Sequence, residues 1–192
     1  MKGPPMGAGG EWIDISLPLK NGMVVYPGDP PVVIEGETDV ARGDATTLSR
    51  ISMGLHSGTH VDAPLHLFEG GLPVDLIPLG RLTGIARVIA IRDEHSIGVH
   101  EIEPHLTGAA GIILFKTRNS ALWSLGGFSP GYVSLSAPAA RYLAKRGAAA
   151  VGIDYLSIDG FGEDNLRAHS ILLDASIPII EGLDLSRVGP GL

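Results

Sequence analysis

Short stretches of alternating apolar and polar residues dominate the first third of the chain. Residues 11–16 (EWIDIS) alternate with a period of two, which predicts a strand, and residues 32–36 (VVIEG) predict a second one. Between them, YPGDPP at 26–31 has the proline, glycine and aspartate content of a tight turn. The N-terminal part of the chain should therefore consist of short strands joined by turns.

The period of two recurs at 50–55 (RISMGL), where Ile51, Met53 and Leu55 are apolar and the residues between them are not. This pattern predicts a half-buried strand. If the alternation continues, His56 lies on the polar face. We therefore expect this strand to carry the residues that follow it to a place outside the core.

After residue 80, apolar runs alternate with segments of helical character. Residues 136–146 predict a helix with Ser136 as its N-cap and Gly147 after its end, and residues 166–174 predict a shorter helix. Buried strands are expected at 85–91, 111–116, 148–154 and 177–182. Because strands and helices interleave, the fold class is α/β or α+β with a mixed sheet.

The length and composition fit one domain. The chain has 192 residues, of which 44% are hydrophobic, and a mean hydropathy of +0.24, so it can bury a core. We expect a flexible leader at 1–10 and a single domain at 11–192. No apolar run approaches the ~18 residues of a membrane span, and the first residues lack the pattern of a signal peptide. These features predict a soluble, cytoplasmic protein with no membrane partner.

Charge and cysteine content narrow the chemistry. The 14 basic and 21 acidic residues leave a net charge of -7, which argues against a nucleic-acid partner because phosphate contact needs clustered basic residues. The absence of cysteine excludes disulfides, thiolate ligands and a cysteine nucleophile. Any transition metal must therefore be held by His, Asp or Glu.

Residues 56–66, HSGTHVDAPLH, combine three histidines and an aspartate. In an extended chain His56 and His60 would lie about 13 Å apart, at ~3.3 Å per residue. The chain must bend if both are to bind one ion, and Gly58 permits the bend. Asp62 shares the side of His60 on any extended stretch. Two imidazoles and a carboxylate with an open position are typical of a catalytic metal site, and the alternative is a solvated loop.

Three further residues are candidates for the same site. His66 has the ordinary pKa near 6.5 that suits a general base and acid, and its alternative role is a hydrogen-bond partner of the ligands. His169, on an apolar helix face, and Glu181, at the end of an apolar strand, can meet if the strand returns beside the helix. Taken singly, they would be a core histidine and a solvated strand end. The histidines within 93–105 have a spacing of five, which predicts a surface position.

HSGTHVDAPLH resembles the HxGTHxDxPxH signature of the metal-dependent cyclase family, which includes bacterial kynurenine formamidases (arylformamidases) and isatin hydrolases. YPGD at 26–29 is similar to the aromatic-PGD turn of that family, and GIDYLSID at 152–159 to its GxDxxSxD segment. His169 and Glu181 fall where the family has its late ligands. The resemblance covers nearly the whole chain after the leader.

This resemblance implies a swivelling β/β/α domain, two divalent metal ions, and assembly into a homodimer or homotetramer with active sites near the subunit contacts. The ions would be zinc, with manganese as the alternative. The first would be held by His56, His60 and Asp62, and the second by Asp62 as a bridge and His169. Glu181 would touch one or both ions, and His66 would be the acid and base.

The function implied by the resemblance is hydrolysis of an aryl amide, with N-formylkynurenine giving kynurenine and formate in tryptophan catabolism. Tyr26 would bind the substrate's ring, at a position where kynurenine formamidases typically have Trp. One alternative is a hydrolase of cyclic amides or lactones, similar to isatin hydrolase. Another is a non-catalytic metal-binding protein of the same fold.

Overall fold

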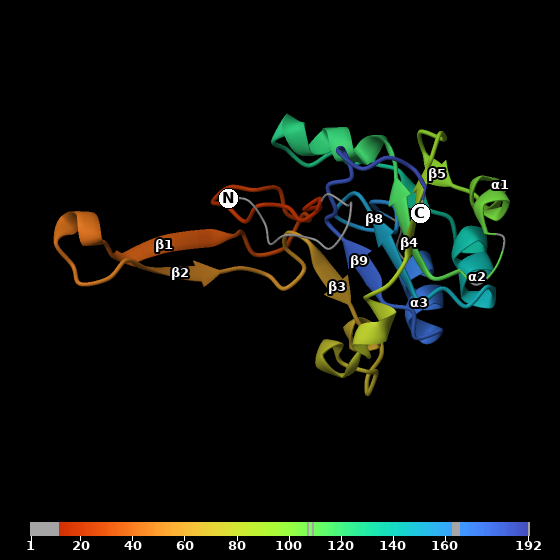
Figure 1. Ribbon diagram of the computed structural model, residues 1–192, viewed down its shortest axis with the longest axis horizontal. Helices are drawn as coiled ribbons and strands as arrows, with labels where there is room; N and C mark the ends of the chain where they lie inside the picture. The colour runs from red at the N-terminus through yellow and green to blue at the C-terminus, as the bar shows by residue number, and fades with distance from the viewer. Residues whose placement is uncertain (1–11, 107, 109, 163–165, 192) are drawn as a thin grey trace.

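The fold is built around a mixed five-stranded β-sheet (Figure 1). The computed structural model describes residues 12–106, 108, 110–162 and 166–191. The strand order is β3-β9-β8-β6-β4, in which β3 is antiparallel to β9 and the other neighbours are parallel. The strands are β3 (His60–Asp62), β4 (Ala86–Ala90), β6 (Ile112–Lys116), β8 (Ala150–Ile153) and β9 (Ile179–Glu181). The predicted class with a mixed sheet is confirmed, whereas the leader predicted at 1–10 lies outside the described residues.

Two helices, α2 (Ala137–Lys145) and α3 (Arg167–Asp174), pack against each other on one face of the sheet. The backbone N–H of Ala139 donates to Ser136 Oγ at 3.3 Å, so α2 begins at its predicted cap. The shorter elements are α1 (Val99–Ile102), the parallel pair β5 (Ser96–Ile97) and β7 (Ser134–Leu135), and 3₁₀ turns at Val40–Arg42, Pro64–His66, Val74–Leu76, Leu79–Arg81, Glu103–His105 and Arg118–Leu125. No helix in the described ranges is long and apolar enough to cross a membrane.

Both faces of the sheet are buried, but unequally. From β6, Ile113 and Phe115 point into the main core beneath α2 and α3, whereas Ile112 and Leu114 contact a smaller cluster around Leu183. Burial on both faces explains why the central strands are continuous apolar runs. A third cluster contains Leu122, Tyr132, Tyr155 and Leu156.

A two-stranded hairpin, β1 (Val33–Thr38) and β2 (Leu48–Ser52), extends away from the sheet (Figure 1). The strand predicted at 50–55 ends at Ser52, and every residue of β2 is exposed, including Ile51 by 47%. The prediction that this strand is half-buried is therefore wrong for the single chain. The hairpin has no second layer on its apolar side among the described residues, and a two-stranded ribbon cannot bury a face alone.

The strand predicted at 11–16 is also absent from the described residues 12–16. Ser16 forms an isolated bridge with Leu183, and no ladder extends from it. Instead, the backbone N–H of Ser16 donates to the Asp14 carboxylate at 2.9 Å, as does the Ser16 hydroxyl. Such local side-chain bonds compete with strand pairing, which explains why the alternating pattern gives no strand here.

Candidate functional site

The candidate metal centre consists of His56, His60, Asp62, His66, His169 and Glu181, and it forms where β3 pairs with β9. In this antiparallel register, His60 lies opposite Glu181 and Asp62 opposite Ile179. The period of two in β3 places the side chains of His60 and Asp62 on the same side. Pairing of two distant segments thus brings Glu181 beside the histidine signature.

Two glycines allow the backbone bend that carries His56 back toward β3. Gly58 has φ +69°, and Gly182, directly after β9, also has φ +69°. A Cβ atom on Gly182 would lie 2.0 Å from Gly58 O, so the two backbones touch at a distance that excludes any side chain. The Thr59 hydroxyl donates to Gly182 O and accepts from Leu17 N at 2.9 Å, which fixes this contact.

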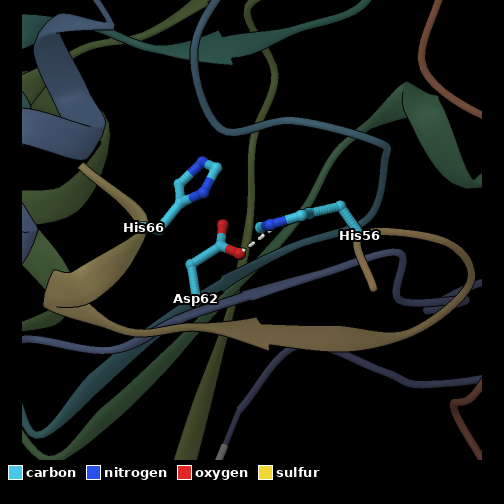
Figure 2. A group of neighbouring side chains, drawn as sticks. All are labelled: His56, Asp62 and His66. Atoms are coloured by element: carbon cyan, nitrogen blue, oxygen red, sulfur yellow. Dashed lines mark ion pairs between the residues drawn. The ribbon is translucent and has the colours of Figure 1, made fainter. Parts of the chain in front are cut away.

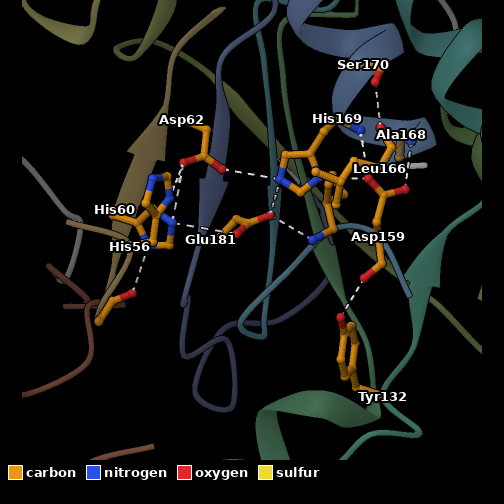
Figure 3. Close-up of polar contacts among 12 residues, drawn as sticks. His56, His60, Asp62, Tyr132, Asp159, Leu166, Ala168, His169, Ser170 and Glu181 are labelled. Carbon is orange, nitrogen blue, oxygen red and sulfur yellow. Dashed lines mark hydrogen bonds and ion pairs between the residues drawn. The ribbon is translucent and has the colours of Figure 1, made fainter. Parts of the chain in front are cut away.

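The Asp62 carboxylate lies at the middle of the site (Figure 3). Its Oδ1 is 2.8 Å from His56 Nδ1 and 3.5 Å from His60 Nε2, and its Oδ2 is 3.4 Å from His169 Nε2. Glu181 lies across from it, with Oε1 3.2 Å from His169 Nε2 and Oε2 3.6 Å from His60 Nε2. Asp62, His169 and Glu181 are buried, although their positions span the chain from 62 to 181.

The His66 ring lies close to both the Asp62 carboxylate and the His56 ring (Figure 2). His66 ends the 3₁₀ turn Pro64–His66, and its ring centroid is 4.2 Å from that of His56 and 5.9 Å from that of His169. His66 is exposed, in contrast to the buried Asp62. Partial burial, reinforced by the nearby histidines and opposed by Asp62, lowers the pKa of His66, so its imidazole is neutral near pH 7 and able to accept a proton.

Asp159 is a site residue that the sequence reasoning did not single out. Its Oδ2 accepts from His169 Nδ1 at 2.7 Å and from His169 N at 3.0 Å, and its Oδ1 accepts from Ala168 N at 2.7 Å. The carboxylate therefore orients the His169 ring with Nε2 toward Asp62 and Glu181, and also satisfies the first turn of α3. The 152–159 segment drew notice only as a likeness to a family motif, because nothing local marks Asp159 as a partner of His169.

A small cavity of about 200 Å³ opens onto this centre and is lined by His56, Asp62, His66, His169, Glu181, Tyr26, Asp29, Leu156, Ser157 and Leu166. Tyr26 begins the predicted turn, in which Asp29 N donates to Tyr26 O at 3.0 Å. Its ring centroid is 5.9 Å from that of Phe128 and 5.8 Å from that of Phe161, and those two are 4.8 Å apart. The cavity thus has a metal-ligand wall and an aromatic wall formed by Tyr26, which packs against Phe128 and Phe161.

The donor set fits divalent cations. Two groups of residues share Asp62, and within each group the ligand atoms lie within 4.8 Å of one another. One group is His56, Asp62 and His66, and the other is His60, Asp62 and Glu181. His60 Nε2 and both Asp62 oxygens are buried. His60 Nε2 has no hydrogen-bond partner in the described residues, and the Asp62 oxygens lie close to the His56 and His169 nitrogens without the geometry of a hydrogen bond. His60 Nδ1 lies 3.2 Å from Gly58 O and can donate to it, which leaves Nε2 as the free ligand atom. A bound cation would satisfy such buried atoms, because their lone pairs can coordinate it.

The pKa shifts agree with a cation-binding centre. Burial raises the pKa of Asp62, but the His169 and His56 rings lower it by more, so the carboxylate stays ionised. Burial lowers the pKa of His169, but Glu181, Asp159 and Asp62 together raise it well above the ordinary value. Without a metal, His169 is therefore protonated near pH 7, and the contact with Asp62 raises the pKa of His56 as well.

All six sequence-predicted residues of the centre lie together, and Tyr26 lies at the rim of the same cavity. Their grouping differs from the one that the resemblance implied. His66 joins His56 and Asp62, whereas His169 lies beside both carboxylates without completing either group. His95, His100 and His105 are exposed, as their spacing predicted.

Comparisons with known proteins show similarity in sequence and in fold. The sequence model of a family described as "Putative cyclase" matches residues 13–160. Kynurenine formamidase of Bacillus cytotoxicus is 33% identical over 182 residues, covering 94% of this chain and 86% of the relative. A solved structure described as a potential metal-dependent hydrolase with cyclase activity has a TM-score of 0.78 and 35% identity, over 93% of this chain and 84% of the other. Isatin hydrolase A from Labrenzia aggregata shares the fold, with a TM-score of 0.79 and 22% identity over 94% of this chain and 83% of the other.

Proposed function

The chain belongs to the cyclase family that its histidine signature predicts, and from this premise we propose that it is a metal-dependent hydrolase of aryl amides. The proposed reaction is hydrolysis of N-formylkynurenine to kynurenine and formate. Kynurenine formamidases are similar to this chain over 94% of its length, which supports this choice. The observation that carries the proposal is the buried Asp62 carboxylate, which lies within 3.5 Å of ring nitrogens of His56, His60 and His169. Glu181 lies across from it, and His60 Nε2 is buried without a hydrogen-bond partner among the described residues.

Two divalent ions, zinc with manganese as the alternative, would be held by His56, His60, Asp62, His169 and Glu181. When bound, such ions supply Lewis-acid chemistry, which polarises a carbonyl and lowers the pKa of water toward neutrality. Asp62 would be common to both ions because Oδ1 lies beside His56 and His60, whereas Oδ2 lies beside His169. Asp159 would hold His169 in the orientation that leaves Nε2 toward the ions.

His66 is proposed as the proton carrier. Its neutral imidazole would take a proton from the attacking water and deliver it to the leaving nitrogen of the amide. Its exposed position at the mouth of the cavity and its lowered pKa support this role. An arylamine leaves more easily than an alkylamine, so a formanilide suits this chemistry.

The aromatic wall supports an aryl substrate. Tyr26 lines the cavity and packs with Phe128 and Phe161 at centroid separations of 4.8 to 5.9 Å, which are typical of favourable aromatic contacts. A substrate ring placed against Tyr26 would extend this cluster. The metal-ligand wall would then face the substrate's formyl group.

The experiment is a substrate panel on protein purified without added metal, with metal content measured on the same sample. N-formylkynurenine should be hydrolysed, with about two equivalents of zinc or manganese per chain expected from a two-metal centre. His66→Ala should lose most of kcat while metal content stays unchanged. The matched control is His105→Ala, which removes an exposed histidine outside the centre and should behave as the unmodified protein.

A second candidate is hydrolysis of a cyclic amide or lactone, favoured by Tyr26, which is smaller than Trp and leaves more room for a fused ring. Ring opening of isatin without formate release from N-formylkynurenine would replace the first proposal with this one. A metal-loaded protein that turns over neither substrate would instead be a non-catalytic metal-binding protein.

We also propose that the chain assembles as a homodimer or homotetramer through the β1–β2 hairpin. Ile51 is 47% exposed and is the cross-strand partner of Ile34, so these two side chains share a face of the ribbon that a second copy could cover. Light scattering should give a multiple of the 20.0 kDa chain mass. Ile51→Glu should shift the mass toward that of one chain, and Leu125→Glu, at an exposed leucine outside the hairpin, should not.

A further inference from the structure

A second cavity has a volume of about 520 Å³. One wall is the N-terminal segment 17–24, and the others are the 3₁₀ turn Arg118–Leu125 and residues 184–186. It shares no lining residue with the cavity of the metal centre. The proposed hydrolysis therefore makes no use of it.

The walls of this cavity are apolar and well anchored. Leu17, Met23, Val24 and Trp123 line it. Trp123 Nε1 donates to Leu183 O at 3.0 Å, and its ring centroid is 4.9 Å from that of Tyr155, so the indole is held in place. A fixed indole among aliphatic side chains favours a flat, apolar ligand group over a polar one.

The lining of this cavity also contains one basic and one acidic side chain. Lys20 and Asp184 both line the cavity, and within the described residues no ion pair joins Lys20 to any acid. Asp184 Oδ1 accepts from Ser186 N at 3.0 Å, which orients the carboxylate. A ligand with a carboxylate for Lys20 and an ammonium for Asp184 would complement both charges.

The wall formed by residues 17–24 is tied to the loop that carries the metal ligands. Leu17 N donates to Thr59 Oγ1 at 2.9 Å. Leu19 packs so closely on Gly58 that a Cβ there would lie 2.7 Å from Leu19 Cδ2. These contacts fix one wall of the cavity to the loop that carries the metal ligands.

We propose that this cavity is a ligand site separate from the metal centre and that it binds an aromatic α-amino acid. The aromatic ring packs on Trp123 and the aliphatic wall, the carboxylate pairs with Lys20, and the ammonium pairs with Asp184. The combination of one fixed indole, one cation and one anion selects this class over simple aromatics, aliphatic acids and amines.

The test uses three probes that differ by one charge at a time, measured by titration calorimetry on the full chain. L-phenylalanine carries both charges, 3-phenylpropionate lacks the ammonium, and phenethylamine lacks the carboxylate. L-phenylalanine should bind tightest. Lys20→Gln should weaken L-phenylalanine and 3-phenylpropionate by roughly threefold to tenfold, as expected for partly exposed ion pairs, and leave phenethylamine unchanged. Asp184→Asn should weaken L-phenylalanine and phenethylamine and leave 3-phenylpropionate unchanged.

Two further variants keep this test independent of the hydrolase proposal. Ala121→Trp, which places a large side chain into the cavity lining, should abolish binding of all three probes. His66→Ala should bind them as the unmodified protein does, whether or not any amide is hydrolysed. Equal binding of the three probes with no response to Lys20→Gln or Asp184→Asn would overturn the proposal, as would no binding at all. Probe binding that is lost when the chain self-associates would also overturn it, and would make the cavity an interface between copies.

Discussion

Replacing Asp159 by Asn tests whether one buried carboxylate both orients His169 and starts α3. Asp159 accepts three hydrogen bonds, two at Oδ2 from His169 and one at Oδ1 from Ala168 N. An asparagine that keeps its oxygen toward His169 must turn its amide N–H₂ toward the Ala168 N–H. One buried backbone donor then loses its acceptor, and the negative charge beside the His169 ring disappears.

The size of each effect follows from these contacts. An unsatisfied buried N–H costs about 1–3 kcal/mol of unfolding free energy. Loss of the carboxylate behind a ligating histidine typically lowers metal affinity about 10–100-fold, or roughly 1.4–2.8 kcal/mol. We therefore expect Asp159→Asn to lower both quantities, because the two roles rest on different atoms of one side chain.

Metal affinity should be measured by competition with a chelator, and stability by urea unfolding of the metal-free protein. The control is Asp154→Asn, at a buried aspartate in the same segment whose carboxylate accepts from Thr117 and Ser120 and makes no hydrogen bond to the metal centre. It should lose stability and keep its metal affinity. If Asp159→Asn lost stability but kept metal affinity within about twofold, far below the usual effect of such partners, Asp159 would be a helix cap only.

Three other outcomes are expected. Metal binding at pH 7 should release a proton from His169, because its pKa is raised in the metal-free protein. The calorimetric enthalpy of metal binding should therefore vary with the ionisation enthalpy of the buffer, and an enthalpy that does not vary would contradict this prediction. The acid limb of the pH profile of kcat/KM should lie below the ordinary histidine pKa of about 6.5, because the pKa of His66 is lowered and the neutral base persists to more acidic pH. If the residual activity of His66→Ala kept the same acid limb, that limb would belong to a group other than His66. Gly182→Ala should lower the free energy of unfolding by about 2–4 kcal/mol or prevent folding, because its Cβ would meet Gly58 O and overpack against rigid backbone. Urea unfolding will measure the loss, with Gly80→Ala, at an exposed glycine, as the control.

Local signals predicted the elements whose cause is local. The Ser136 cap lies within the sequence of α2 itself, and the apolar runs of β6 and β8 reflect burial on both faces. The density of polar groups at 56–66, together with the family signature, indicated a metal site before any contact was known. Glu181 was a weak candidate because its meeting with His60 depends on the register of β3 against β9, which no short stretch of sequence contains.

The incorrect predictions concern elements whose structure depends on contacts that the local sequence pattern does not contain. The alternation at 50–55 shows that β2 has an apolar side, but not which surface covers it, and within one chain nothing described does so. At residues 12–16, the hydrogen bonds from Ser16 to Asp14 override a pattern that predicted a strand. Asp159 went unnoticed because its role is defined by partners in a helix that begins after it.

The capping of α3 from outside its own segment has a consequence for the order in which the protein folds. Its N-cap residue, Leu166, makes no capping bond, and the helix is only eight residues long. Isolated helices shorter than about 12–15 residues are marginal in water. We therefore expect α3 to form only after the turn that follows β8 has positioned Asp159. His169 would then be among the last groups to reach its place, so a chain emerging from the ribosome could gather its early histidines well before it could hold a complete pair of ions.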